Sequence, residues 1–284
     1  MPALFELMPD GMRQRALLLL KTLQDEIKTN RLVLPTLPDV AIKVKQLTAN
    51  NSLTLSRLEN EILKDPGITA RIMKVANSSV MLRGRPATSL NQAISSLGLN
   101  LVNSLVTQIL ILQTFEKHGN KQQTQVFINT NLTISAICHS LAELHPHLDP
   151  ELAALAGLLH DVGRLPLGAF LAKQPNVKPE EYRQFEHLLH CAVGSIMLRQ
   201  WHFSEELISV ARFHEQILRD TGNAQPDYID IVIAANILHH GTHQWPYQRF
   251  AKQPIPALSK STLGTNRLED LEKISKRASL FSLS

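Results

Sequence analysis

The chain has 284 residues, of which 44% are hydrophobic and 19% charged, and its formal net charge is +4. This length can bury a large core, and so slight a basic excess does not indicate a nucleic-acid-binding protein. Two cysteines are too few for a disulfide scaffold and fit a reducing compartment. The sequence shows no export signal and no run of about 20 apolar residues, so we expect a cytoplasmic protein without a membrane partner.

Helical periodicity runs along nearly the whole chain, and no segment alternates as a strand would, so we predict an all-α fold. Asp65-Pro66 and Asp149-Pro150 each predict a helix start, because Asp caps a helix and Pro fits its first turn. A short helix should run from a cap at Ser89 to Gly98. A longer helix follows, with an apolar stripe at Leu101, Leu105, Ile109 and Leu112.

The polar run 117–125 predicts a junction between two parts of the chain. We expect an N-terminal helix within 1–31, one helical subdomain over 32–117, and a second over 126–243 that packs on the first. Helices of the second subdomain should span about 190–201, 204–215 and 227–240. The segment 244–284 should be irregular, with a final helix over about 267–280.

The most informative local pattern is an apolar helix that ends in His160-Asp161, followed by Gly163 and Arg164. An imidazole nitrogen and a carboxylate oxygen can bind one metal ion, and side chains at a helix end can point into one pocket. The dipeptide alone is weak evidence, because a helix C-terminus also favours a histidine for electrostatic reasons.

Three further histidines lie on otherwise apolar helix faces. His139 lies about 20 residues before the His-Asp pair, and His190 and His214 follow it. A titratable side chain on such a face needs a partner, which can be a hydrogen-bonding group of the core or a metal ion. Taken singly, such histidines are more often hydrogen-bonded core residues than metal ligands.

The first half of the chain carries an ordered set of motifs. They are Leu34-Pro35-Thr36-Leu37-Pro38, Asp65-Pro66, Ala76-Asn77-Ser78, Ser89-Leu90-Asn91-Gln92-Ala93-Ile94 and Leu97-Gly98-Leu99. This series closely resembles the HDOD family, over about 32–240. The resemblance implies an all-helical domain, a core like that of the HD phosphohydrolases, and a regulatory role in bacterial signal transduction.

The resemblance also implies a set of site residues. The HD pattern of His, His-Asp and Asp corresponds to His139, His160-Asp161 and a late position that is Asn236 here. His190 and His214 extend the pattern, so these six residues are the candidate ligands of one or two divalent ions, Fe, Mn or Zn. Asn236 brings no charge where active HD enzymes have aspartate, so the site should be degenerate. Glu215 could add charge, whereas Asp230 should face elsewhere.

Two functions follow from these residues. The first is a non-catalytic signalling module that binds protein partners or a small phosphorylated ligand. The second is a metal-dependent phosphohydrolase acting on a nucleotide or cyclic dinucleotide, with Asp161 and Arg164 as candidate catalytic residues, since Arg binds phosphate well. Asn236 favours the first function. Direct nucleic-acid binding is not expected, because only the mild basicity supports it.

Overall fold

The structure is a computed structural model that describes residues 9–29, 31–32, 54–77, 85–99, 102, 105–106, 109, 121–241, 247–250 and 252–261. These residues contain helices and no strand, which confirms the all-α fold. In chain order the helices are α2 (Asp10–Lys28), α4 (Leu55–Ile62), α5 (Pro66–Ala76), α6 (Leu90–Leu97), α8 (Lys121–Ala142), α9 (Pro150–Leu159), α10 (Arg164–Leu171), α11 (Tyr182–Gln200), α12 (Glu205–Phe213), α13 (Tyr228–His240) and α14 (Pro256–Ser261). Two short 3₁₀ helices, Pro179–Glu181 and Tyr247–Phe250, also lie within the described residues.

The expected helix boundaries are present where the capping chemistry predicts them. The carboxylate of Asp65 accepts hydrogen bonds from the backbone N–H groups of the first turn of α5, and Asp149 does the same for α9. Ser89 caps α6, which ends at Gly98 in the left-handed region, with φ at +86°.

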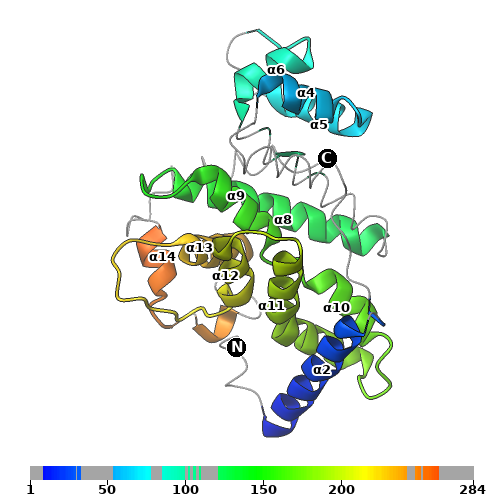
Figure 1. Ribbon diagram of the computed structural model, residues 1–284. Helices are drawn as coiled ribbons and strands as arrows, with labels where there is room; N and C mark the ends of the chain where they lie inside the picture. The colour runs from blue at the N-terminus through cyan, green and yellow to red at the C-terminus, as the bar shows by residue number, and fades with distance from the viewer. Residues whose placement is uncertain are drawn as a thin grey trace.

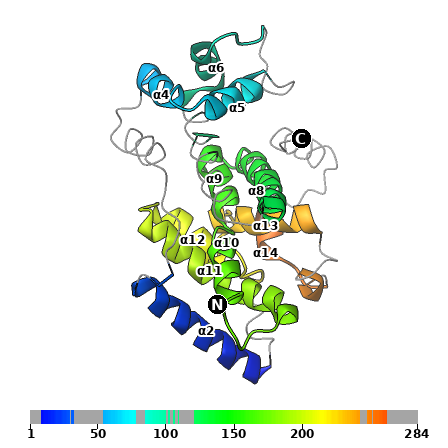
Figure 2. The ribbon, with the colours of Figure 1, turned by 90° about the vertical axis from the view of Figure 1, so that its right-hand side faces the viewer.

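Helices α4, α5 and α6 pack on one another and form a group at one end of the molecule (Figures 1 and 2). Leu58, Ile68 and Ile94 are buried within this group. The side-chain amide of Asn77 donates to the carbonyl of Ala87 at 2.9 Å and accepts from its N–H at 2.7 Å. Asn77 therefore has the structural role of holding the connection between α5 and α6.

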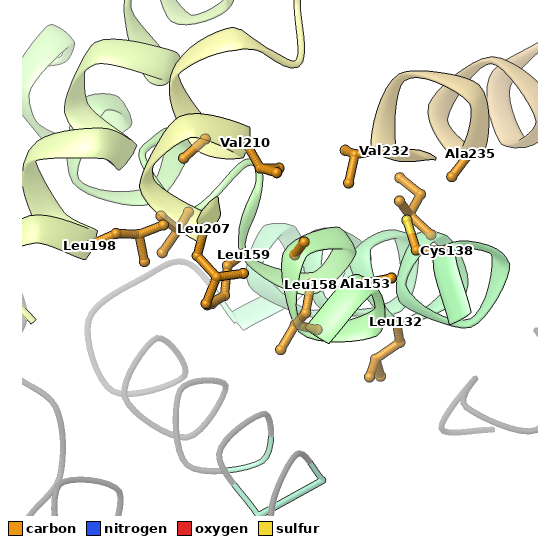
Figure 3. Packing of buried hydrophobic residues seen from close by; sticks show 14 of the residues in the cluster. Leu132, Cys138, Ala153, Leu158, Leu159, Leu198, Leu207, Val210, Val232 and Ala235 are labelled. Carbon is orange, nitrogen blue, oxygen red and sulfur yellow. The ribbon is translucent and has the colours of Figure 1, made fainter. Parts of the chain in front are cut away.

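Helices α8 to α13 form a second group, in which α8 and α9 pack closely along their length (Figure 1). A Cβ atom at Gly157 would lie 3.0 Å from the backbone of Ser135, so glycine allows the two helices this approach. Figure 3 shows the buried apolar side chains where α9 meets α11, α12 and α13, including Leu158, Leu159, Leu207 and Val232.

The N-terminal helix α2 lies along α11 of the second group (Figures 1 and 2). The guanidinium of Arg15 donates to both carboxylate oxygens of Glu181, at 2.6 and 2.9 Å, and to the carbonyl of Asn176 at 2.7 Å. It also lies over the ring of Phe185, 5.1 Å from the ring centroid. Sequence periodicity gave no indication of this contact.

Several element boundaries differ from the sequence prediction. Helix α8 begins at Lys121, inside the expected polar junction, and α11 begins at Tyr182, well before residue 190. Helix α14 lies in a segment that was expected to be irregular, and α10 was not predicted. The final helix over 267–280 lies outside the described residues.

The predicted apolar stripe is described at two of its four positions. Leu105 and Ile109 are buried, together with Val102 and Val106, whereas Leu101 and Leu112 lie outside the described residues. The packing of two subdomains through this stripe stays a prediction. None of the described helices combines the length and apolar character that a membrane crossing would require.

Candidate metal centre

The site begins where α9 ends. The chain turns from His160 through Gly163 into α10, and a Cβ atom at Gly163 would lie 2.1 Å from the carbonyl oxygen of His190. It would also lie 2.4 Å from the backbone nitrogen of Gly194. Only glycine permits this contact, and the contact places the side chain of Asp161 next to the histidine of α11.

Two buried imidazoles face each other beside Asp161. The Nε2 atoms of His190 and His214 are 3.1 Å apart, and Asp161 Oδ1 lies 3.0 Å from the first and 3.3 Å from the second. We call the rings of His190 and His214 the imidazole pair. Helix α11 supplies one ring, and the other comes from the residue that follows α12.

Backbone contacts fix the tautomer of each ring. The Nδ1 atom of His190 lies 3.0 Å from the carbonyl oxygen of Glu186, and that of His214 lies 3.0 Å from the carbonyl of Val210. A carbonyl only accepts hydrogen bonds, so both Nδ1 atoms carry the proton. In the neutral rings both Nε2 atoms therefore present lone pairs toward each other, an arrangement that repels unless a cation or an added proton lies between them.

Asp161 Oδ1 is buried and, among the described residues, has no hydrogen bond of acceptable geometry despite its two close imidazole neighbours. A buried carboxylate oxygen without a hydrogen bond is costly. Divalent ions bind through imidazole nitrogen and carboxylate oxygen, and His190, His214, Asp161 and Glu215 place such ligand atoms within 4.8 Å of one another. The residues present therefore fit a divalent metal ion.

The second oxygen of Asp161 is held by Arg164. The Arg164 Nε–H donates to Asp161 Oδ2 at 2.6 Å, and the guanidinium also lies 3.3 Å from Glu186 and 3.9 Å from Glu215. Burial alone would raise the pKa of Asp161, but Arg164 and the neighbouring histidines hold it well below its usual range. Asp161 is therefore an anion at neutral pH.

Burial has the larger effect on Glu215. It raises the pKa of this carboxyl to about 7, even though His214 and His190 act in the opposite direction. Glu215 also lies 3.4 Å from Nε2 of His187, another buried residue of α11. At neutral pH, Asp161 is therefore fully ionised, whereas the carboxyl of Glu215 is partly protonated.

Cys191 lies against the imidazole pair. Its Sγ atom is 3.5 Å from Nε2 of His190 and 4.0 Å from Nε2 of His214. Burial would raise the pKa of the thiol, but the two imidazoles lower it to about 5. In turn, Cys191 and Asp161 overcome the effect of burial on His190 and raise its pKa to about 9.

His160 stands beside the imidazole pair. Its Nδ1–H donates to the carbonyl of Gly157 at 2.7 Å, its Nε2 lies 3.6 Å from Asp161 Oδ2, and its ring meets that of His214 edge to face. Burial lowers the pKa of His160 to about 3, so this ring stays neutral and its Nε2 can act as an acceptor or ligand.

Asn236 is buried on α13, and none of the hydrogen bonds among the described residues involves its amide. His240 follows one turn later, so the two side chains share a helix face. The charges of Asp161 and Arg164 contribute to the pKa of His240, which burial lowers to about 4. The inclusion of Asn236 in the site stays a prediction.

The structure does not bring His139 into the cluster. Its Nε2 lies 3.2 Å from Glu151 at the start of α9, whereas His160 follows the last residue of that helix. Nine residues of helix separate the two ends by about 13 Å. Asp230 also faces elsewhere, as expected, because Arg219 donates to its carboxylate at 2.9 Å.

Sequence reasoning missed several residues of the site. Cys191, Glu186 and His187 were not considered as neighbours of the candidate ligands. A usable pattern existed, because Glu186 and His187 precede His190 by four and three residues and so share its helix face. The contacts of Arg164 with Glu186 and Glu215 could not be read from the sequence, because they join residues distant along the chain, whereas its contact with Asp161 is local.

The comparisons agree with the fold. A family model for the HDOD domain matches residues 34–217. A solved structure from Shewanella amazonensis SB2B, a candidate metal-dependent phosphohydrolase by its name, is 26% identical with a TM-score of 0.71. That match covers 93% of this chain and 99% of the other.

Two further solved structures share the fold. An HDOD domain protein of unknown function from Geobacter sulfurreducens is 20% identical, covers 95% of this chain and 99% of its own, and has a TM-score of 0.68. A candidate signal transduction protein from Marinobacter aquaeolei VT8 is 20% identical, with a TM-score of 0.59, over 91% of this chain and 59% of its own. No curated protein matches the chain. The motif series, the helical fold and the family match together show that this chain belongs to the HDOD domain family.

Proposed function

We propose that this chain is a regulatory protein of signal transduction that binds one or two divalent metal ions at the imidazole pair and hydrolyses phosphoesters slowly or not at all. The observation that carries the metal site is Asp161 Oδ1, a buried anionic oxygen 3.0 and 3.3 Å from two imidazole nitrogens without a hydrogen bond to either. His190, His214 and Asp161 would hold the ion, with His160 and Asn236 at its margin. Iron, manganese and zinc all suit imidazole and carboxylate ligands.

The charge of the site argues against efficient hydrolysis. A bound divalent ion would supply Lewis acidity toward a phosphoryl oxygen and toward water. Asp161 is partly neutralised by Arg164 at 2.6 Å, and Glu215 is partly protonated near neutral pH. Asn236 adds no charge at the position where the family resemblance places an aspartate. A site with so few anions binds a hard cation weakly.

Phosphoester hydrolysis is the second candidate function, because the cluster of ligand residues is retained and a neighbour of similar fold is named for that activity. Arg164 would be the phosphate-binding residue in that case. Its guanidinium is already engaged by Asp161, Glu186 and Glu215, so a phosphate would have to compete with three carboxylates. This engagement favours a role in orienting Asp161.

The partners follow from the regulatory role. We infer that the chain acts through other signalling proteins, with a small phosphorylated molecule as a further candidate ligand. A bacterial cytoplasm is its expected location, since both described cysteines are free and buried as a reducing compartment allows. We expect neither nucleic acid nor a membrane among its partners.

The test is a phosphodiesterase assay with added manganese on nucleotides and cyclic dinucleotides. It compares the natural protein with Asn236→Asp and His160→Ala, and Asn223→Asp adds the same charge at an exposed loop as a control. The proposal predicts little or no turnover by the natural protein and by Asn223→Asp, and a gain by Asn236→Asp. Rapid hydrolysis by the natural protein that His160→Ala abolishes would contradict it.

A further inference from the structure

The imidazole pair has ligand atoms on more than one side. Asp161 and Glu215 form one set with the two rings, and Cys191 forms a second set with the same rings. Within each set the ligand atoms lie within 4.8 Å of one another, but the thiol and the carboxylates do not combine into one set at that distance. We call these the carboxylate set and the thiolate set.

The spacing of the thiolate set is close to that of a tetrahedral zinc site. Tetrahedral zinc, with Zn–N near 2.0–2.1 Å and Zn–S near 2.3 Å, places its N and S ligand atoms about 3.5 Å apart and two N ligands about 3.4 Å apart. The observed separations are 3.5 and 4.0 Å from sulfur to the two nitrogens and 3.1 Å between the nitrogens. Small shifts of the side chains would suffice to bind the ion.

Burial distinguishes the two sets. Cys191, His190 and His214 are all buried, whereas the side chains of Asp161 and Arg164 are 15% and 22% exposed. Glu215 of the carboxylate set is buried as well, so the two sets differ in exposure only at Asp161, and the thiolate set is the one whose ligand residues are all buried. An enclosed set of thiolate and imidazole ligands is typical of zinc sites, while manganese and magnesium prefer oxygen.

The other cysteine of the chain has a different environment. Cys138 lies on α8 and packs against Gly157: a Cβ atom added at Gly157 would come within 2.7 Å of the Cys138 sulfur. Among the described residues, Cys138 belongs to no group that could hold a metal ion. Cys138 is thus a packing residue of the helix interface. Of the two cysteines, Cys191 is the one that lies beside imidazole rings, and this points to a ligand role for its thiol.

We propose that Cys191 is a zinc ligand that acts with His190 and His214, so that this chain binds zinc through the thiolate set in preference to manganese through the carboxylate set. This inference rests on the proposed metal binding at the imidazole pair. It adds the choice of metal: an ion held by the thiolate set occupies both Nε2 atoms and so excludes a second ion from the carboxylate set. Zinc would then act as an antagonist of any manganese-dependent property of the site.

The test uses cobalt(II) added to the full chain after removal of metal, because cobalt replaces zinc and a bound thiolate gives it a near-ultraviolet charge-transfer band. The natural protein and Cys138→Ser should show this band, and Cys191→Ser should lack it. Zinc affinity should fall at least about 10- to 100-fold in Cys191→Ser, because loss of even a residue that only supports a metal ligand weakens binding by that factor. Manganese affinity should change little. X-ray absorption at the zinc edge of the natural protein should show a sulfur neighbour, which avoids dependence on a variant that folds poorly.

The outcomes separate this inference from the proposed function. Cobalt bound with visible bands but without the charge-transfer band, or a band that survives in Cys191→Ser, would overturn the thiolate ligand and leave the metal site standing. Absence of a sulfur neighbour in zinc-loaded protein would have the same meaning. Failure of cobalt, zinc and manganese all to bind would overturn both.

Discussion

Each ring of the imidazole pair donates its Nδ1 proton to a carbonyl one turn earlier in its own helix. The helix backbone thereby orients the ring and leaves Nε2 as the atom that faces the neighbouring ring. A supporting hydrogen bond on the far nitrogen is the usual arrangement of a metal-binding histidine. Without a cation, the facing nitrogens need an added proton between them. Cys191 and Asp161 raise the pKa of His190 to about 9, so this ring is protonated at neutral pH.

Gly163→Ala should destabilise the protein by about 3 kcal/mol or more, because the new methyl group would overlap the carbonyl of His190 and the backbone of Gly194. Gly168→Ala, in the helix α10 that Gly163 precedes, is the matched control, since a Cβ atom there meets nothing within 4 Å. The control should be neutral or up to about 1 kcal/mol stabilising. Urea unfolding measures both. Equal stabilities for the two variants would mean that α10 can move away from α11 at little cost.

The sequence allowed part of the candidate site to be anticipated. His160, Asp161, His190 and His214 do gather, because a helix end and two apolar helix faces meet in the core. His139 does not join them, since Glu151 offers it a carboxylate at 3.2 Å on the neighbouring helix. Which face of a helix meets which neighbour depends on tertiary packing, and sequence order alone could not exclude His139 or include Cys191.

At the scale of elements, capping chemistry was the most reliable guide. Asp65, Ser89 and Asp149 each cap a helix through local contacts that depend on few residues. Helix α10 was missed because it is only eight residues long and contains Pro166 and Gly168, which resemble loop residues in a sequence. Such a helix forms because its neighbours bury Leu167 and Phe170 completely.

The contact between α2 and the second helical group should weaken in acid. Arg15 lowers the pKa of Glu181 to about 2 through their hydrogen bonds, below its ordinary value of 4.5. The stabilisation is therefore complete above about pH 4.5 and is lost as the pH falls toward 2. Urea unfolding at a series of pH values should show Arg15→Ala less stable than the natural protein at neutral pH, with the difference shrinking below pH 4.5.

Arg13→Ala is the control for that measurement, because Arg13 lies on the same helix and pairs locally with exposed Asp10. It should leave stability nearly unchanged across the pH series. A difference between Arg15→Ala and natural protein that stayed constant down to pH 2 would show that the packing of Arg15 on Phe185, and not the ion pair, provides the stabilisation.

At the scale of the whole molecule, we predict that the first half of the chain depends on the apolar stripe that includes Leu105. Leu105→Asp should cost several kcal/mol, since Leu105 is 4% exposed and an unpaired charge would be buried. Leu18→Asp introduces the same charge at a position that is 65% exposed, and it should change stability by less than about 0.5 kcal/mol. Thermal unfolding compares the two. An unchanged melting temperature for Leu105→Asp would mean that this stripe is accessible, as a partner surface would be.

The fold class could be predicted from periodicity, yet the arrangement of the elements could not. Helix α2 lies on α11, about 160 residues later in the chain, through an ion pair and a cation–π contact that no periodic pattern encodes. Long-range contacts of this kind decide where the N-terminal helix lies. The same holds for the candidate metal centre, whose residues come from α11 and from the turns that follow α9 and α12.

The proposed binding of a divalent ion at the imidazole pair can be tested by locating the ion. Anomalous X-ray scattering from crystals of the full chain, soaked separately in zinc and in manganese, locates such an ion directly. We expect an anomalous peak within bonding distance of Nε2 of both His190 and His214. Protein saturated with metal but showing no peak at these nitrogens, or showing its peak only at other residues, would contradict this proposal.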